Sequence, residues 1–157
     1  MNNYQAKVQL TREGYDEFKE ELRLIVDKKR PAAVERLSNA RSMGDLSENS
    51  DYHQAREALE FMDGRMSELE AILQQAQVIK RTSGKKNEVE FGTKVRVKAN
   101  GDEHTFHIVG EWEADPAEKK ISHESPLGQA LVGKRVGDKV EVEAPAGKVE
   151  YTVLGIE

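Results

Sequence analysis

Two acidic residues, Asp45 and Glu48, stand three positions apart in the polar segment Asp45-Leu46-Ser47-Glu48-Asn49. Paired carboxylates suit two tasks, which are holding a divalent cation such as Mg²⁺ and orienting a water molecule for attack. Two carboxylates alone are too few for a closed protein metal site. Because Mg²⁺ commonly keeps several waters and takes one or two carboxylates, this pair could complete a site supplied mostly by another macromolecule.

The same spacing has a simpler structural interpretation. Asp45-x-x-Glu48 matches a capping box, with Asp45 as the N-cap and Glu48 as the third residue of a helix. Both acids would also favour a helix N-terminus electrostatically. From the residues alone, capping is the more economical explanation, and an outward-facing functional role stays open beside it.

Long helices are predicted on both sides of this segment, which would place it at the end of a hairpin. Residues 11–41 are predicted to form one helix with Thr11 as the N-cap, a kink or restart at Pro31, and a stop at Gly44. The second helix shows apolar residues in alternating steps of three and four, a coiled-coil seam of Tyr52, Ala55, Leu59, Met62, Met66, Leu69, Leu73 and Ala76. Helices joined by so short a loop pack antiparallel, giving an arm of about 45 Å.

The hydrophobic period changes in the second half of the chain. A polar linker is predicted over 81–88, and alternating apolar residues in 89–157 predict strands. Asn100-Gly101 marks a hairpin turn, and Ser125 and Pro126 would be the N-cap and first residue of a short helix. The predicted fold class is therefore α+β, with a long antiparallel coiled-coil hairpin over residues 1–80 and a small antiparallel sheet domain over 89–157.

Composition excludes several classes of protein. The chain contains no cysteine, so it has neither a disulfide framework nor a thiolate metal site. No apolar run approaches 18 residues and no signal peptide is evident, so we expect a cytoplasmic protein without membrane contact. The net charge of −5 argues against general binding of nucleic acid by a basic surface.

Five segments together resemble the Gre family of bacterial transcript-cleavage factors, and within it the GreA-type members. They are LTREGY at 10–15, KRP at 29–31, ARSMGDLSEN at 40–49, AQVI at 76–79 and SPLGQALVGK at 125–134. The resemblance covers essentially the whole chain, and the acidic motif is specific when it lies between two long helices.

This resemblance implies a partner and a mechanism. Family members bind bacterial RNA polymerase and pass the coiled coil through its secondary channel to the active centre. Asp45 and Glu48 would there be the catalytic acids, sharing Mg²⁺ with the polymerase, and Asp45 is the stronger candidate for a metal ligand. The polymerase would then cleave backtracked RNA near its 3′ end. The protein would not itself be an enzyme, and the free protein, expected to be a monomer, would bind no metal.

Other residues acquire roles from the same resemblance. Leu46, Ser47 and Asn49 would support the loop, and Ser47 and Asn49 could also contact nucleic acid or the polymerase. Arg41 and Arg56 match the small basic patch of GreA-type members, which contacts the extruded 3′ segment of the nascent RNA.

The C-terminal half would be the FKBP-like domain of the family, which docks at the channel entrance without prolyl isomerase activity. Glu124, Ser125 and Pro126 match the docking loop, although Glu124 departs from the Asp or Asn that is common there. Helix capping explains Ser125 and Pro126 equally well.

Two other functions are compatible with this architecture. One is an inhibitor that uses the same arm to plug the channel, but such relatives typically have altered tips, and Asp45 and Glu48 are retained here. The other is a peptidyl-prolyl isomerase carried on a coiled coil. The low aromatic content of the C-terminal half argues against the aromatic pocket that such an enzyme needs.

Overall fold

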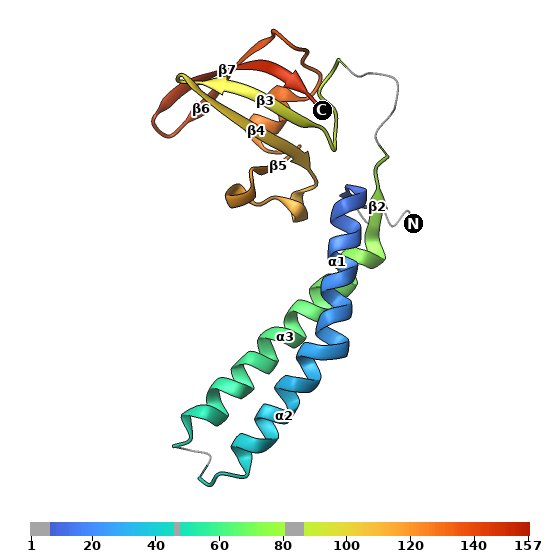
Figure 1. The fold of residues 1–157 in the computed structure, drawn as a ribbon, viewed down its shortest axis with the longest axis vertical. Helices are drawn as coiled ribbons and strands as arrows, with labels where there is room; N and C mark the ends of the chain where they lie inside the picture. Colours follow the sequence, from blue (N-terminus) through green and yellow to red (C-terminus); the bar gives the residue numbers. More distant parts are fainter. Residues whose placement is uncertain (1–6, 46–47, 81–86) are drawn as a thin grey trace, which may run out of the picture. The chain divides into compact units, whose positions relative to one another are not determined.

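The computed structural model describes residues 7–45, 48–80 and 87–157. The expected linker therefore lies largely outside the described residues, as do Leu46 and Ser47. The described chain divides into two compact units (Figure 1), one spanning Tyr15–Ala76 and the other comprising Lys7–Gly14 together with Gln77–Glu157. The first is helical and the second contains the main sheet, so the predicted α+β class is confirmed.

The first predicted helix is present but has three parts. These are α1 (Arg12–Leu24), the π-helical turn η1 (Ile25–Lys29) and α2 (Arg30–Arg41). In the turn, the Arg30 N–H donates to the Ile25 carbonyl, five residues back. Pro31 follows directly, and because proline has no N–H, the regular ladder cannot continue unchanged past it. The predicted cap is confirmed, since the Gly14 N–H donates to Thr11 Oγ1 over 3.0 Å.

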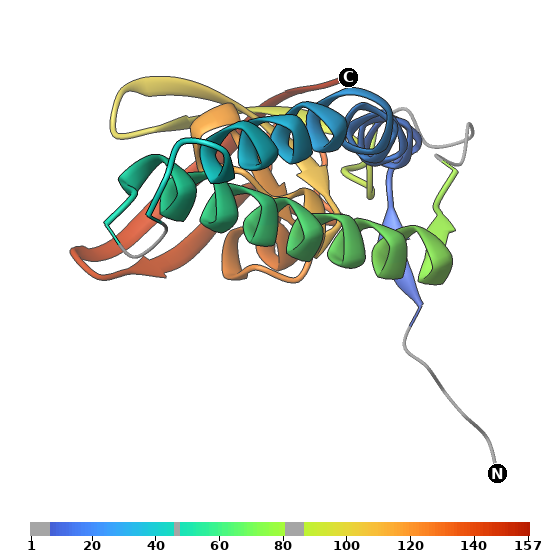
Figure 2. The same ribbon diagram turned by 90° about the horizontal axis from the view of Figure 1, so that it is seen from below.

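The returning helix α3 (Ser50–Gln75) runs beside α2 in both views of the ribbon (Figures 1 and 2). Its 26 residues give a length of about 39 Å. The predicted seam needs two corrections. Ile72 is buried where Leu73 was expected and Leu73 is half-buried, because three- and four-residue steps do not keep one straight face over many turns. Ala76 lies outside the helix, in the short strand β2 (Ala76–Val78).

Ion pairs between helices fix the register of the hairpin. Arg65 on α3 makes a two-pronged contact with Glu21 on α1, with Nε–Oε1 and Nη2–Oε2 distances of 2.7 and 2.9 Å. Donation to the Glu21 carboxylate raises the pKa of the Arg65 guanidinium. Arg30 at the start of α2 pairs with Asp63 on α3 over 2.8 Å. The charges on the outside of the hairpin therefore specify how the two helices align.

The second unit is built on a five-stranded sheet. Its strands, in the spatial order β5-β4-β3-β7-β6, are β3 (Lys94–Ala99), β4 (Asp102–Val109), β5 (Lys120–Ser122), β6 (Lys139–Ala144) and β7 (Gly147–Ile156). The predicted antiparallel arrangement holds except at β5, which pairs with β4 in parallel. The two-residue turn Asn100-Gly101 joins β3 to β4 with φ angles of 52° and 83°, as its sequence predicts.

The core of this unit lies between the sheet and the helix α4 (Pro126–Leu131). It consists of the buried residues Val89, Val95, Val97, Ile108, Leu131, Val140 and Val153. Strand β3 alternates buried and exposed positions along its whole length, so the period-two pattern of the sequence does mark its core face. None of the helices in the described ranges is long and apolar enough to cross a membrane.

One carboxylate in the second unit joins two segments that are far apart in the sequence. Glu113, in the 3₁₀ turn η2 (Glu111–Glu113), accepts hydrogen bonds from the N–H groups of Thr11 and Gly110 at 3.0 and 2.9 Å, and from the Thr11 hydroxyl. Thr11 is buried. A Cβ added at Gly14 would overlap the Glu113 carboxylate, so a larger residue there would displace this side chain from its hydrogen bonds. The segment that opens α1 is thus joined to η2 through one side chain.

Removing this carboxylate is predicted to destabilise the second unit. In Glu113→Ala the buried donors of Thr11 lose their acceptor, and we expect a loss of about 2 to 3 kcal/mol in the free energy of unfolding. Urea titration followed by the fluorescence of Trp112, the chain's only tryptophan, measures it. The matched control is Glu111→Ala, which removes an exposed carboxylate from the same turn. Equal midpoints for the two variants would refute the role assigned to Glu113.

Candidate functional site

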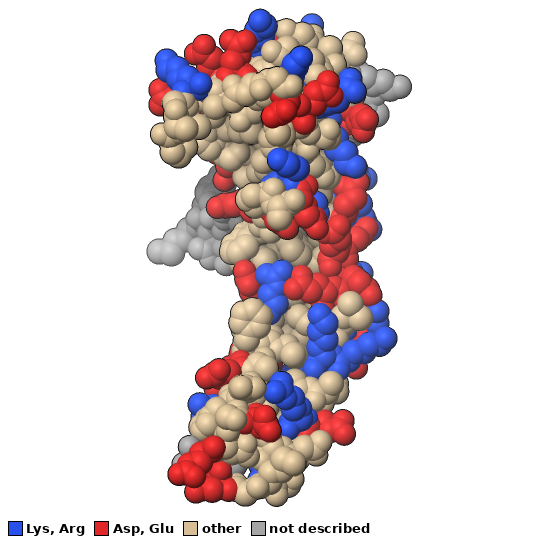
Figure 3. Space-filling model, turned by 60° about the vertical axis from the view of Figure 1, so that its left-hand side comes forward, with Lys and Arg blue, Asp and Glu red and all other residues tan. Residues whose placement is uncertain are grey.

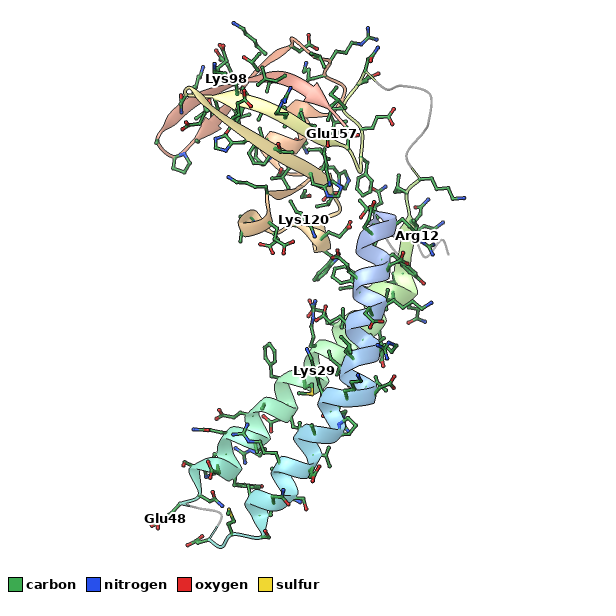
Figure 4. The ribbon with its side chains drawn as sticks, viewed as in Figure 1. Arg12, Lys29, Glu48, Lys98, Lys120 and Glu157 are labelled. Atoms are coloured by element: carbon green, nitrogen blue, oxygen red, sulfur yellow. The ribbon has the colours of Figure 1, made fainter. Side chains whose placement is uncertain are left out.

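The acidic segment lies at the end of the helical hairpin, between the end of α2 at Arg41 and the start of α3 at Ser50. Asp45 and Glu48 are both exposed, and Glu48 stands at the far end of the hairpin (Figure 4). Acidic atoms also gather at this end in the space-filling view (Figure 3). We refer to residues 45–49 as the acidic tip. It presents negative charge beyond the last turn of either helix.

Asn49 joins the two helices at the tip. Its side-chain amide donates to the Ala40 carbonyl in the last turn of α2 over 2.8 Å, while its Oδ1 accepts from the Tyr52 N–H over 3.1 Å. Asn49 is therefore the N-cap of α3. Gly44, with a φ of 125°, turns the chain after α2 as its sequence position predicts.

The predicted capping box is wrong. Asp45 was expected to be the N-cap and Glu48 the third helical residue, but α3 begins only at Ser50. Asparagine is as good a cap as aspartate, and Asn49 can also reach back to α2 with its amide group. Glu48 consequently precedes the cap, and neither carboxylate caps α3. The capping-box interpretation of these two acids therefore does not hold for α3.

The tip has the composition of a partial metal site. Asp45 and Glu48 are exposed carboxylates, and Asp51 in the first turn of α3 adds a third acidic residue nearby in the sequence. Such oxygen donors suit Mg²⁺, which accepts one or two protein carboxylates and completes its shell with water or other ligands. Among the described residues, no three such side chains come together to hold a metal ion, so the tip offers at most part of a coordination shell.

The structure also brings together the two predicted arginines. Arg41 ends α2 and Arg56 lies on α3, yet both guanidinium carbons stand near the ring of Tyr52, at 5.8 and 6.0 Å from its centroid. Arg56 also lies 3.8 Å from Glu60. We call Arg41 and Arg56 the arginine pair. Sequence reasoning assigned Tyr52 only to the helix seam, although an aromatic residue four positions before an arginine was a usable signal.

The predicted docking residues lie in the second unit at the start of α4. Ser125 Oγ accepts from the Gly128 N–H over 3.0 Å and donates to the Ser122 carbonyl over 2.6 Å. Ser125 is thus the helix cap that the alternative interpretation expected. Glu124 and Pro126 are exposed on either side of it, so these two are the residues of the segment that a partner can reach.

Comparison with known proteins identifies relatives along nearly the whole chain. Residues 8–78 match the model of the family described as transcription elongation factor, N-terminal, and residues 84–157 match transcription elongation factor, GreA/GreB, C-term. The chain is 45% identical over 152 residues to the transcription elongation factor GreA of Thermodesulfovibrio yellowstonii, covering 96% of each chain. It is 40% identical over 153 residues to GreA of Sinorhizobium medicae, covering 96% of this chain and 97% of the relative.

Among solved structures, the chain is similar to GreA factor homolog 1 (Gfh1) of Thermus thermophilus. That match has 28% sequence identity and a TM-score of 0.44, and it covers 96% of this chain and 99% of the other.

Loss of the tip cap is predicted to loosen the end of the hairpin. Asn49→Ala removes both hydrogen bonds of this side chain, which should cost about 1 kcal/mol of stability and accelerate amide exchange in the first turn of α3. Hydrogen–deuterium exchange of a peptide spanning residues 40–55 measures it. Asn39→Ala, an exposed change on α2, is the matched control. Exchange as slow in Asn49→Ala as in the control would contradict the bridging role.

Proposed function

Because the chain belongs to the GreA/GreB family of transcription elongation factors, we propose that it acts on RNA polymerase through its acidic tip. The hairpin enters the secondary channel of bacterial RNA polymerase and brings the tip to the active centre. There it stimulates the polymerase's own endonucleolytic cleavage of backtracked RNA and so rescues arrested complexes. The observation that carries this proposal is the pair of exposed carboxylates beyond the end of both helices.

The dimensions of the hairpin support entry into a narrow passage. Its helix α3 alone has 26 residues, a length of about 39 Å. Two packed helices, each about 10 to 12 Å across with side chains, make an arm much longer than it is wide. Ala40 and Ala55 are buried near the tip, and small side chains there let the two helices approach closely.

Asp45 and Glu48 supply the charge in this mechanism. Together with ligands of the polymerase, these two side chains would hold Mg²⁺, which would supply Lewis-acid activation of phosphate and water. Asp45 is the metal-ligand candidate, and Glu48 orients the attacking water by accepting its hydrogen bond. Because the tip provides only part of a site, the protein is a cofactor of the polymerase and not an enzyme.

The arginine pair provides the complementary contact. The extruded 3′ segment of backtracked RNA is a single strand of phosphates, and guanidinium groups bind phosphate oxygens with paired hydrogen bonds. Arg41 and Arg56 come from the two helices next to the tip and hold this segment while the acids act. Such contacts position the RNA without reading its sequence.

The second unit docks at the channel entrance. Glu124 and Pro126, which are exposed beside the cap of α4, are the contacts we assign to this step. Ser125 serves the docking loop indirectly, because its two hydrogen bonds hold the turn between β5 and α4. Catalysis of proline isomerisation plays no part in this function.

Neutralising the tip is predicted to abolish cleavage without abolishing binding. In Asp45→Asn and Glu48→Gln the size of each side chain is kept while its charge is lost. We expect RNA cleavage in stalled, backtracked polymerase complexes with Mg²⁺ to fall by about 100-fold. Displacement of labelled wild-type protein from the polymerase should be unchanged. The control is Glu35→Gln, which neutralises an exposed acid elsewhere on the hairpin.

The same assay separates the alternatives. Full cleavage with both tip variants would refute the role of the acids. A wild-type protein that binds the polymerase and slows elongation without shortening the RNA would instead be a channel inhibitor. Polymerase-free samples should leave RNA intact, because the tip holds only part of the catalytic site.

A further inference from the structure

We infer that Tyr52 is a positioning residue that gathers Arg41 and Arg56 into one cationic site for two phosphates of the extruded RNA. This inference rests on the proposed function and deepens it. It adds an aromatic residue to a contact that the sequence assigned to two arginines alone.

The ring of Tyr52 is the point that the two guanidinium groups share. Arg41 approaches it from α2 at 5.8 Å, and Arg56 approaches it from one turn further along α3 at 6.0 Å. Both distances are within the range in which a cation is attracted by the quadrupole of an aromatic face. Tyr52 is half-buried whereas both arginines are exposed, so the ring is partly covered while both charges face solvent.

Without the ring, three effects would favour separation of the two arginines. Like charges repel, and each long side chain loses rotamer freedom when it is held in one place. Arg56 has another partner in Glu60, 3.8 Å away on the same helix. The face of Tyr52 offsets the repulsion and competes with Glu60. It therefore keeps both cations at the end of the hairpin, where the RNA is expected.

The position of the ring is itself fixed by the tip. The Tyr52 N–H donates to Asn49 Oδ1, and the Asn49 amide donates to the carbonyl of Ala40, the residue before Arg41. The Asn49 side chain thus sets the distance between the backbone at Tyr52 and the backbone next to Arg41. The cap, the ring and the arginine pair form one unit next to the two acids.

This arrangement has a chemical consequence for RNA. Two planar cations held near one ring can each direct paired N–H donors at a phosphate, so they can bind two phosphates of one strand at little further cost in ordering. Separated arginines would each have to be ordered during binding. The ring therefore contributes to RNA binding through the arginines and makes no contact of its own.

The experiment compares Tyr52→Phe, which keeps the ring, with Tyr52→Leu, which removes it. In the free protein, ring currents should shift the Nε–H resonances of Arg41 and Arg56 upfield in the wild type and in Tyr52→Phe, and the shift should vanish in Tyr52→Leu. In backtracked complexes, Tyr52→Leu should lower the cleavage rate about threefold, the effect of an exposed cation–π contact, and Tyr52→Phe should retain it. The defect should diminish at high salt because exposed charges are screened.

A double-mutant comparison tests whether Tyr52 acts through the arginines. In a protein that carries Arg41→Gln and Arg56→Gln, adding Tyr52→Leu should cause no further loss of cleavage. A further threefold loss would overturn the inference, because it would indicate direct contact with RNA or a structural role. The inference would also be overturned if Tyr52→Leu stimulated cleavage as well as the wild type in an assay in which Asp45→Asn does not stimulate it. If the wild type itself stimulates no cleavage, the proposed function has failed, and the resonances still report whether the ring holds the arginines.

Discussion

A single asparagine side chain joins the two helices at the point where the hairpin reverses. Asn49 donates to the end of α2 and accepts from the start of α3, so it satisfies backbone groups that helix ends otherwise leave open. Because it performs the capping, the two acids before it are not needed to cap α3. The exposure of Asp45 and Glu48, and the meeting of Arg41 with Tyr52, both depend on this bridge.

The remainder of the hairpin keeps that end in register. Two ion pairs connect the first half of the hairpin to α3 at different points along its length. They are Arg30 with Asp63 and Arg65 with Glu21. Exposed ion pairs contribute little stability each, but the two-pronged Arg65 contact has a defined geometry, and one-turn slippage would break it. Buried Ala40 and Ala55 allow close approach near the tip. Stability comes mainly from the apolar seam, and alignment comes from the charges.

Much of this fold follows from local sequence patterns. Both long helices, the Thr11 cap, the Asn100-Gly101 turn and the Ser125 cap were predictable because each depends on residues a few positions apart. The parallel strand β5 and the ribbon of β1 (Val8–Leu10) with β2 were missed. They have three residues each and are defined by partners distant in the sequence. The capping-box prediction was wrong because Asp45 and Asn49 are both suitable N-cap residues close to the start of α3. The sequence does not reveal that the Asn49 side chain also donates to the Ala40 carbonyl.

In the candidate site, as in the fold, some features follow from local sequence and others only from the tertiary structure. The acids were found because their types and spacing are chemical signals in themselves. The role inferred for Tyr52 was not predictable, because its contact with Arg41 crosses the hairpin and exists only once the helices are paired. An exposed carboxylate pair binds Mg²⁺ weakly by itself, since a divalent ion requires more ligands than two. On the proposed mechanism that weakness is useful, because cleavage chemistry is then confined to the place where the polymerase supplies the remaining ligands.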